Sequence, residues 1–274
     1  MKYRWIAFLF FIYVPAASAH DFFLFPSSFH CRRGDSVIVR IHVDDVFPGK
    51  STKWNSSRVL RFEAWWNHQK IDTLKYSLLS DSSGVNVKFE KAGLHMFALD
   101  WSARLIELKP DEYREYLTSE GLDHILNLRK ERNEENKPGR ERYSRYVKTL
   151  LDCQSSRQEN ASKEVGQTIE LIPLENPYHK TVGDTFHVKL MFKGKPLAHA
   201  LVSGTYTGFT DKPDTYHQSA RTDSNGVVGV HLTSVGPWLI RTVHMLPLNN
   251  SKEADWESWW ASLTFEVKQQ ERIK

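Results

Sequence analysis

Alternation of apolar and polar side chains with a period of two is the feature that most restricts how this chain can fold. In residues 36–43 every second residue is aliphatic, the pattern of a half-buried strand. Further candidate strands follow at short intervals, separated by turn-forming residues such as Asp81-Ser82-Ser83-Gly84. They are residues 59–66, 70–78, 85–90 and 94–101. Several short strands at this spacing predict a β-sandwich, the architecture of Ig-like domains.

A second group of short strands occupies the last hundred residues. The Asp223-Ser224-Asn225-Gly226 turn is the strongest hairpin signal, because Asn-Gly supplies the positive φ angles that tight turns need. These strands predict a second compact antiparallel sandwich. They are residues 168–172, 185–192, 201–206, 219–222, 227–232, 238–245 and 260–267.

Between the two groups the period changes to that of helices. Pro110 followed by two acidic residues is a helix start, and Gly121 is its stop. Residues 122–135 and 140–152 each place apolar residues at helical spacing, so two more helices are expected. The dense charges of 129–135 and 140–145 are interpreted as a solvated face. The polar stretch 154–166 is expected to be a linker.

The sequence therefore predicts a mainly β chain, made of two β-sandwich domains with a helical insert between them. The expected boundaries are 1–19 for a signal peptide, 20–108 for the N-terminal sandwich, 109–153 for the helical insert, 154–166 for the linker and 167–268 for the C-terminal sandwich.

The N-terminus has the three parts of an export signal. Lys2 and Arg4 precede an apolar run at 5–14, and the small-residue pattern Ala17-x-Ala19 follows. The run is too short to span a membrane, which takes about 20 apolar residues. We expect cleavage between Ala19 and His20, which makes the mature protein periplasmic or secreted. Its first residue is then a histidine, whose free α-amine and imidazole can chelate one metal ion together.

Two cysteines, Cys31 and Cys153, are the number that one disulfide in an oxidising compartment would use. Two unpaired thiols are the alternative, because the sequence does not show that the sulfur atoms meet. Neither has a neighbouring Cys or His at zinc-site spacing.

Charge and histidine content narrow the classes of partner. The net charge is only +4, with basic and acidic residues interleaved, so no nucleic-acid partner is expected. Twelve histidines make a metal or proton role more plausible without locating it. By periodicity alone, His95 and His244 share strand faces with apolar residues, which favours packed, hydrogen-bonded side chains over metal ligands.

Many motifs along the mature chain resemble a bacterial periplasmic family of unknown function, often described as the periplasmic component of a nickel/cobalt uptake system. The most specific is Asp255-Trp256-Glu257-Ser258-x-Trp260-Ala261-Ser262-Leu263-Thr264-Phe265-Glu266. The others are residues 20–26, 93–95, 106–108, 116–123, 140–145 with Lys148, 194–197, 222–223, 238–240 and 243–245.

This resemblance implies two β-sandwiches, the second similar to transthyretin-like modules, and it changes the interpretation of three histidines. His20, His95 and His244 lie within the matching motifs, so we expect them to bind a divalent transition metal together. Imidazole and amine donors suit the later first-row ions. The resemblance favours nickel or cobalt, with copper or zinc as alternatives, and an inner-membrane metal transporter as partner.

Two other classes of function remain open. A non-catalytic module could bind a glycan or protein through exposed rings of Trp65-Trp66 or Trp259-Trp260, although adjacent strand residues face opposite ways. A copper-dependent oxygenase could also use an N-terminal histidine with a second histidine. The sequence has no Ser/His/Asp motif, phosphate loop or paired-carboxylate signature, so we expect no enzyme of those classes.

Overall fold

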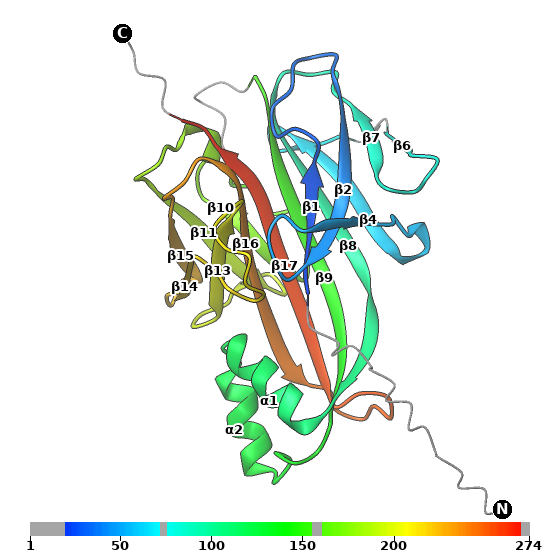
Figure 1. The fold of residues 1–274 in the computed structure, drawn as a ribbon, viewed down its shortest axis with the longest axis vertical. Helices are drawn as coiled ribbons and strands as arrows, with labels where there is room; N and C mark the ends of the chain where they lie inside the picture. Colours follow the sequence, from blue (N-terminus) through cyan, green and yellow to red (C-terminus); the bar gives the residue numbers. More distant parts are fainter. Residues whose placement is uncertain (1–19, 72–75, 155–160, 270–274) are drawn as a thin grey trace, which may run out of the picture.

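The computed structural model describes residues 20–71, 76–154 and 161–269, and this part of the chain is mainly β with two α-helices. One eight-stranded sheet runs through the whole molecule, in the order β14-β13-β16-β17-β9-β8-β4-β5 (Figure 1). Its strands are β4 (Val59–Trp66), β5 (Gln69–Lys70), β8 (Gly93–Leu108), β9 (Gly139–Cys153), β13 (Leu201–Tyr206), β14 (Gln218–Arg221), β16 (Gly236–Pro247) and β17 (Trp256–Val267).

Two smaller sheets cover this central sheet from opposite sides. One has the order β1-β2-β7-β6, with β3 paired to β2, and the other has β10-β11-β12, with β15 paired to β11. The first contains β1 (Asp21–Pro26), β2 (Ser36–Asp44), β3 (Lys50–Thr52), β6 (Tyr76–Leu78) and β7 (Val85–Lys88). The second contains β10 (Ile169–Pro173), β11 (Thr185–Phe192), β12 (Lys195–Pro196) and β15 (Val227–His231).

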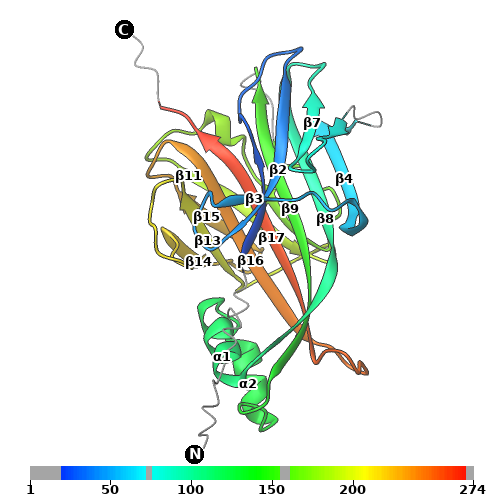
Figure 2. The same ribbon diagram turned by 45° about the vertical axis from the view of Figure 1, so that its right-hand side comes forward.

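Strand alternation explains how one sheet supports two cores. On β8, Phe97 and Leu99 join the core under β1 and β2, whereas Met96 and Ala98 join the core under β10 and β11. Successive side chains point to opposite faces, so β8 and β9 are buried on both sides. Figure 2 shows these long strands passing between the two smaller sheets.

Helices α1 (Pro110–Ser119) and α2 (Asp123–Glu131) pack at one end of the long strands (Figure 1). Glu112 in the first turn of α1 accepts the backbone N–H of Lys109 at 3.2 Å, which caps the helix. Tyr113 packs directly on Gly139 of β9, where a Cβ would stand only 2.1 Å from the ring. Only glycine permits this approach, which fixes α1 against the central sheet.

The expected strands other than 70–78 are confirmed, and so are the helix start at Pro110 and its stop near Gly121. Of the expected strand 70–78, β5 ends at Lys70, β6 covers only Tyr76–Leu78, and residues 72–75 lie outside the described ranges. The third expected helix is wrong, because residues 140–152 form strand β9. β9 pairs with β8 on one side and runs parallel to β17 on the other. The expected solvated face at 140–145 is also wrong, because Glu141 and Arg145 are buried. The expected signal peptide lies outside the described residues, as does part of the expected linker.

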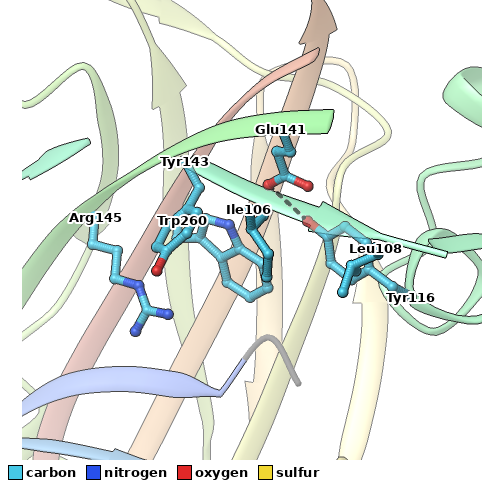
Figure 3. A pocket seen from close by; sticks show the side chains of 7 residues that line it. All are labelled: Ile106, Leu108, Tyr116, Glu141, Tyr143, Arg145 and Trp260. Carbon is cyan, nitrogen blue, oxygen red and sulfur yellow. Dashed lines mark hydrogen bonds between the residues drawn. The ribbon is translucent and has the colours of Figure 1, made fainter. Parts of the chain in front are cut away.

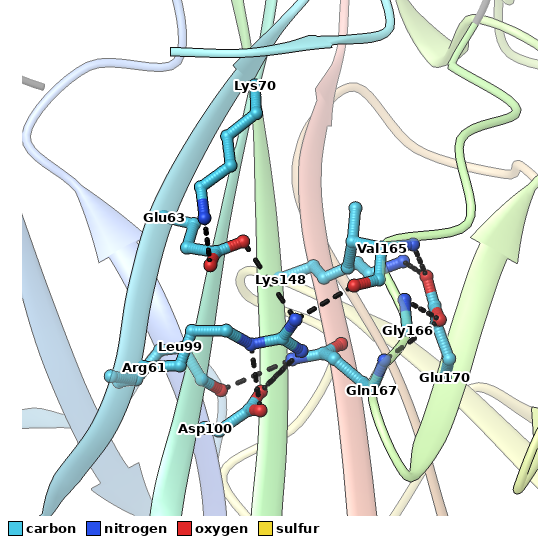
Figure 4. Close-up of polar contacts among 10 residues, drawn as sticks. All are labelled: Arg61, Glu63, Lys70, Leu99, Asp100, Lys148, Val165, Gly166, Gln167 and Glu170. Atoms are coloured by element: carbon cyan, nitrogen blue, oxygen red, sulfur yellow. Dashed lines mark hydrogen bonds and ion pairs between the residues drawn. The ribbon is translucent and has the colours of Figure 1, made fainter. Parts of the chain in front are cut away.

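A buried polar network holds the described part of that linker to the central sheet (Figure 4). The Glu170 carboxylate accepts the backbone N–H groups of Val165, Gly166 and Gln167 at 2.6 to 3.1 Å. It also accepts a hydrogen bond from Lys148 Nζ at 2.6 Å. Arg61 donates to the Val165 carbonyl at 2.8 Å. Ala161 and Val165 of this stretch are buried, whereas Glu164 and Gly166 are exposed.

Candidate functional site at the start of the first strand

His20 immediately precedes β1 and lies beside a carboxylate. Its side chain is 45% exposed, and its Nδ1 atom is 2.5 Å from Oδ1 of Asp45, which follows β2. The antiparallel pairing of β1 with β2 aligns Asp21 with Asp44, and so brings Asp45 next to His20. His20 and Asp45, which are distant in sequence, thus lie together at one corner of a polar cluster.

Asp21 forms the second corner, below the surface. Arg241 on β16 is 4% exposed and donates through Nε to Asp21 Oδ1 at 2.7 Å. Its two terminal nitrogens donate to both carboxylate oxygens of Glu120, which follows α1. Tyr216 donates its hydroxyl to Asp21 Oδ2 at 3.1 Å. Burial alone would lower the pKa of Arg241, but the Asp21 and Glu120 carboxylates outweigh it and hold that pKa above its ordinary value.

Asp214 adds another carboxyl group to this cluster. Its backbone N–H donates to the Asp45 carbonyl at 3.1 Å. Burial, together with the neighbouring charges of Asp45, Asp21 and Glu120, raises the pKa of the Asp214 carboxyl to about 6. Four carboxyl groups therefore share one arginine and the His20 imidazole. We call His20, Asp21, Asp45, Glu120, Asp214, Tyr216 and Arg241 the N-terminal cluster.

Beside this cluster lies a small pocket of about 30 Å³ (Figure 3). Trp260 stacks parallel to Tyr116, with 6.0 Å between ring centroids, and Arg145 lies across the Trp260 ring at the same distance. Glu141 accepts hydrogen bonds from the hydroxyl of Ser258 and, at 3.3 Å, from Tyr116. We call this the aromatic pocket. Its lining consists of Ile106, Leu108, Tyr116, Glu141, Tyr143, Arg145 and Trp260.

His95 lies on β8, far from the N-terminal cluster in the register of the sheet. It is 3% exposed, its Nε2 is 2.9 Å from the Lys91 carbonyl, and its ring meets the Phe89 ring edge-on at 4.8 Å. These are the surroundings of a packed histidine.

His244 lies on the opposite face of the central sheet. It packs 4.6 Å from the Phe192 ring and 5.9 Å from His124, and burial lowers its pKa to about 4. Neighbouring Arg241 and Val243 point the other way, toward β1 and the helices.

Strand register shows that these two histidines do not meet. His244 aligns through Trp259 with Ser144 of β9, whereas His95 aligns with Leu151 of the same strand. At 3.3 Å per residue the two levels are about 23 Å apart along β9. Within the described ranges, no three His, Cys, Asp or Glu side chains are arranged to hold a metal ion. Of the predicted ligands, only His20 lies in the N-terminal cluster.

Several residues of the N-terminal cluster and of the aromatic pocket were not predicted from the sequence. Glu120, Glu141 and Arg145 lie within matching motifs, but nothing in the pattern marked them as buried. No sequence pattern indicated that Asp45 or Asp214 belongs to a site. The alternative hypothesis requires exposed tryptophan rings, but Trp259 and Trp260 are both buried. Trp65 and Trp66 are partly exposed, with the Trp66 indole donating to the Ala92 carbonyl at 2.8 Å.

The fold and this geometry define a mainly β protein with a carboxylate-rich cluster where its first strand begins. The chain belongs to the DUF4198 family, a domain of unknown function, whose sequence profile matches residues 17–246. No curated protein matches it. In the part that the structure describes, neither helix is long and apolar enough to cross a membrane.

Solved structures resemble the chain only weakly. The D0-D1 domain of intimin is 12% identical, with a TM-score of 0.20, over 89% of this chain and 97% of that one. The mouse coronavirus receptor-binding domain complexed with its murine receptor is 7% identical, with a TM-score of 0.21, over 91% of this chain and 100% of that one. Scores this low support no conclusion about function.

Proposed function

We propose that this protein is a periplasmic metal-binding protein that captures a divalent transition metal ion with His20 and Asp45. The observation that supports it is the 2.5 Å contact between His20 Nδ1 and Asp45 Oδ1 at the expected mature N-terminus. Cleavage between Ala19 and His20 would free an α-amine on the same residue as the imidazole. The site would then offer two nitrogen donors and one carboxylate.

The electrostatic surroundings favour a cation at this place. Asp21 and Glu120 are paired with Arg241, and Asp45 is paired with His20. The negative charges of Asp45, Asp21 and Glu120 act on Asp214, and Arg241 offsets them only in part. Burial is the main cause of the raised pKa of Asp214, and repulsion by the neighbouring carboxylates adds to it. A divalent ion would relieve this repulsion, and it is the cargo here rather than a resident cofactor.

The donor set suits nickel, cobalt, copper and zinc. Among these ions, intrinsic affinity is highest for copper, so affinity alone does not select nickel or cobalt. We propose nickel or cobalt as the cargo and an inner-membrane metal transporter as its recipient. His95 and His244 would not complete this site, because His244 faces the other side of the sheet and His95 is packed against Phe89.

The layout of the fold is part of the same proposal. The two expected sandwiches would share the central sheet, one closing over β1 and β2 and the other over β10 and β11. Each has its own apolar core.

The decisive experiment compares the mature protein beginning at His20 with a twin that carries one extra residue before it. The extra residue converts the α-amine into an amide, which no longer binds metal as an amine does. We expect the twin to bind nickel, cobalt, copper and zinc at least tenfold more weakly in isothermal titration calorimetry. Equal binding by both proteins would reject the site.

Matched variants assign the side chains. His20→Ala and Asp45→Asn should each weaken binding. His187→Ala should not, although His187 forms a similar exposed pair with Glu175 at 3.0 Å on the distant β11. Affinity should also fall as the pH is lowered, because amine and imidazole donors bind metal only without their protons.

A further inference from the structure

Arg145 on β9 is a buried arginine, and in the described ranges 20–71, 76–154 and 161–269 no hydrogen bond or ion pair joins its guanidinium to another residue. The residue is only 9% exposed, and its Nε atom is buried. Arginine carries five N–H donors and stays charged in proteins. Burial of such a group is unfavourable unless hydrogen bonds and an opposite charge compensate it.

Aromatic rings surround this guanidinium. Its carbon lies 4.9 Å from the centroid of the Phe22 ring, 5.2 Å from that of Tyr143 and 6.0 Å from that of Trp260. A ring face attracts a cation. It does not replace a hydrogen-bond acceptor in the plane of the guanidinium, however. The rings therefore stabilise the charge in part and leave the N–H donors at the guanidinium edge without an acceptor.

The nearby carboxyl groups are engaged elsewhere. Asp21 acts on Arg145 through its charge. Its two oxygens, however, accept hydrogen bonds from Arg241 at 2.7 Å and from Tyr216 at 3.1 Å. Glu141 lines the same pocket, but it is four residues away on β9, about 13 Å along the strand. Burial raises the pKa of the Glu141 carboxyl to about 7, so this group is mostly uncharged at pH 6.

Arg241 shows how a comparable arginine is compensated in the same molecule. It is 4% exposed and lies 4.9 Å from the Trp260 ring, so its burial and aromatic contact resemble those of Arg145. Arg241 differs because it donates to the carboxylates of Asp21 and Glu120. The two arginines lie near one indole ring, and only Arg241 has anionic partners. Arg145 therefore calls for an anion rather than for more aromatic contact.

The volume beside Arg145 limits the size of that anion. The aromatic pocket, which Arg145 lines, has a volume of about 30 Å³ (Figure 3). One water molecule needs roughly 10–15 Å³ of such space, so the pocket has room for about two waters. An organic acid with a ring or an alkyl chain is too large. A chloride ion fits, because it is only slightly larger than a water molecule.

We propose that the aromatic pocket binds a single chloride ion, which accepts hydrogen bonds from the N–H edge of the Arg145 guanidinium. Hydrogen bonds from a charged donor to an anion are stronger than those between neutral groups. The ion also supplies a negative charge, which a water molecule in the same place does not. The rings of Phe22, Tyr143 and Trp260 keep their contacts with the guanidinium. This site is independent of the metal proposed at His20.

Chlorine nuclear magnetic resonance on the metal-free mature protein tests this site at pH 6, where Glu141 is mostly uncharged. Chloride that exchanges with a protein site broadens the signal of the free ion, so we expect an excess linewidth that saturates as chloride is added. Bromide should remove this excess. Gluconate at the same ionic strength should not, because it is too large for the pocket. Equal effects of bromide and gluconate, or no excess linewidth, would reject the proposal.

Variants identify the arginine. Arg145→Met should reduce the excess linewidth at least fivefold. Arg132→Met is the control, because Arg132 also lies over an indole, 5.7 Å from Trp256, but is exposed and lies outside the pocket. It should keep the linewidth of the parent protein. An unchanged linewidth in Arg145→Met would place the bound chloride elsewhere and overturn the assignment.

Crystals of the parent protein grown in bromide provide a second test, which does not depend on how any variant folds. Bromide has the charge of chloride and is located directly by its anomalous scattering. We expect one anomalous peak within hydrogen-bond distance of the Arg145 guanidinium. A water molecule without anomalous signal at that position would reject the chloride site.

Discussion

Lys148 and Glu170 form an ion pair at the centre of the molecule, with 2.6 Å between Nζ and Oε1 and both side chains 1% exposed. Lys148 comes from the central sheet and Glu170 from the sheet that covers it (Figure 4). Burial lowers the pKa of Lys148, and the Glu170 carboxylate partly offsets this effect. The pair thus joins two sheets in space, although their strands β9 and β10 are separated in sequence by the expected linker.

The two halves of this pair should differ in their effect on stability. In Lys148→Met, the Glu170 carboxylate still accepts its three backbone N–H donors. In Glu170→Leu, those three N–H groups and the Lys148 ammonium group all lose their acceptor. Removing one partner of a buried pair typically costs about 3–5 kcal/mol. We expect Glu170→Leu to reach or exceed this range and Lys148→Met to fall below it, as measured by urea denaturation. The reverse order would contradict the network in Figure 4.

The thiols of Cys31 and Cys153 lie against each other in the structure, both buried and unbonded. Burial raises the pKa of the Cys31 thiol well above its usual value, so little thiolate forms and spontaneous oxidation should be slow. In an oxidising compartment we expect a disulfide, which would stabilise the fold by about 5 kcal/mol in the chain-entropy model. Protein purified from the periplasm should therefore lose thermal stability on reduction. Two thiols titrating in the unreduced, denatured protein would contradict this.

Strand β9 shows where sequence reasoning failed. Tyr143, Val147 and Leu150 have helical spacing, and the charged residues between them suggested a solvated face. In the structure both faces of β9 are covered, so Arg145 and Lys148 are buried and the alternation of a half-exposed strand is absent. Strands with one solvated face, such as β2, were identified correctly.

The candidate site was only partly visible for a related reason. His20 was marked by its position after the signal pattern. Asp45 and Asp214 joined it through pairings between segments distant in sequence, which no local period records. The parallel pairing of β9 with β17 is another such contact, and it determines which residues share a level in the sheet.

Glu141 gives a pH dependence that can be measured directly. Burial raises the pKa of its carboxyl from 4.5 to about 7. The folded state therefore holds a proton that the unfolded state releases, and stability should fall as the pH rises from 4.5 to 7. Glu141→Gln removes this loss, by up to about 3 kcal/mol above pH 7. Urea denaturation at pH 5 and pH 8 should show the variant gaining on the parent only at the higher pH.

His244 should produce the opposite slope at lower pH. Burial lowers its pKa from 6.5 to about 4, with the charges of His124 and Lys193 adding to the effect. Below pH 6.5 the unfolded chain binds a proton at this histidine, whereas the folded state does not. The free energy of unfolding should therefore fall as the pH drops from 6.5 to 4, by up to about 3 kcal/mol. His244→Leu fits the apolar contacts with Phe192 and should flatten this part of the curve. His187→Leu, on the exposed face of β11, should keep the parent slope. Identical slopes for the parent and His244→Leu would show that His244 is not the group responsible.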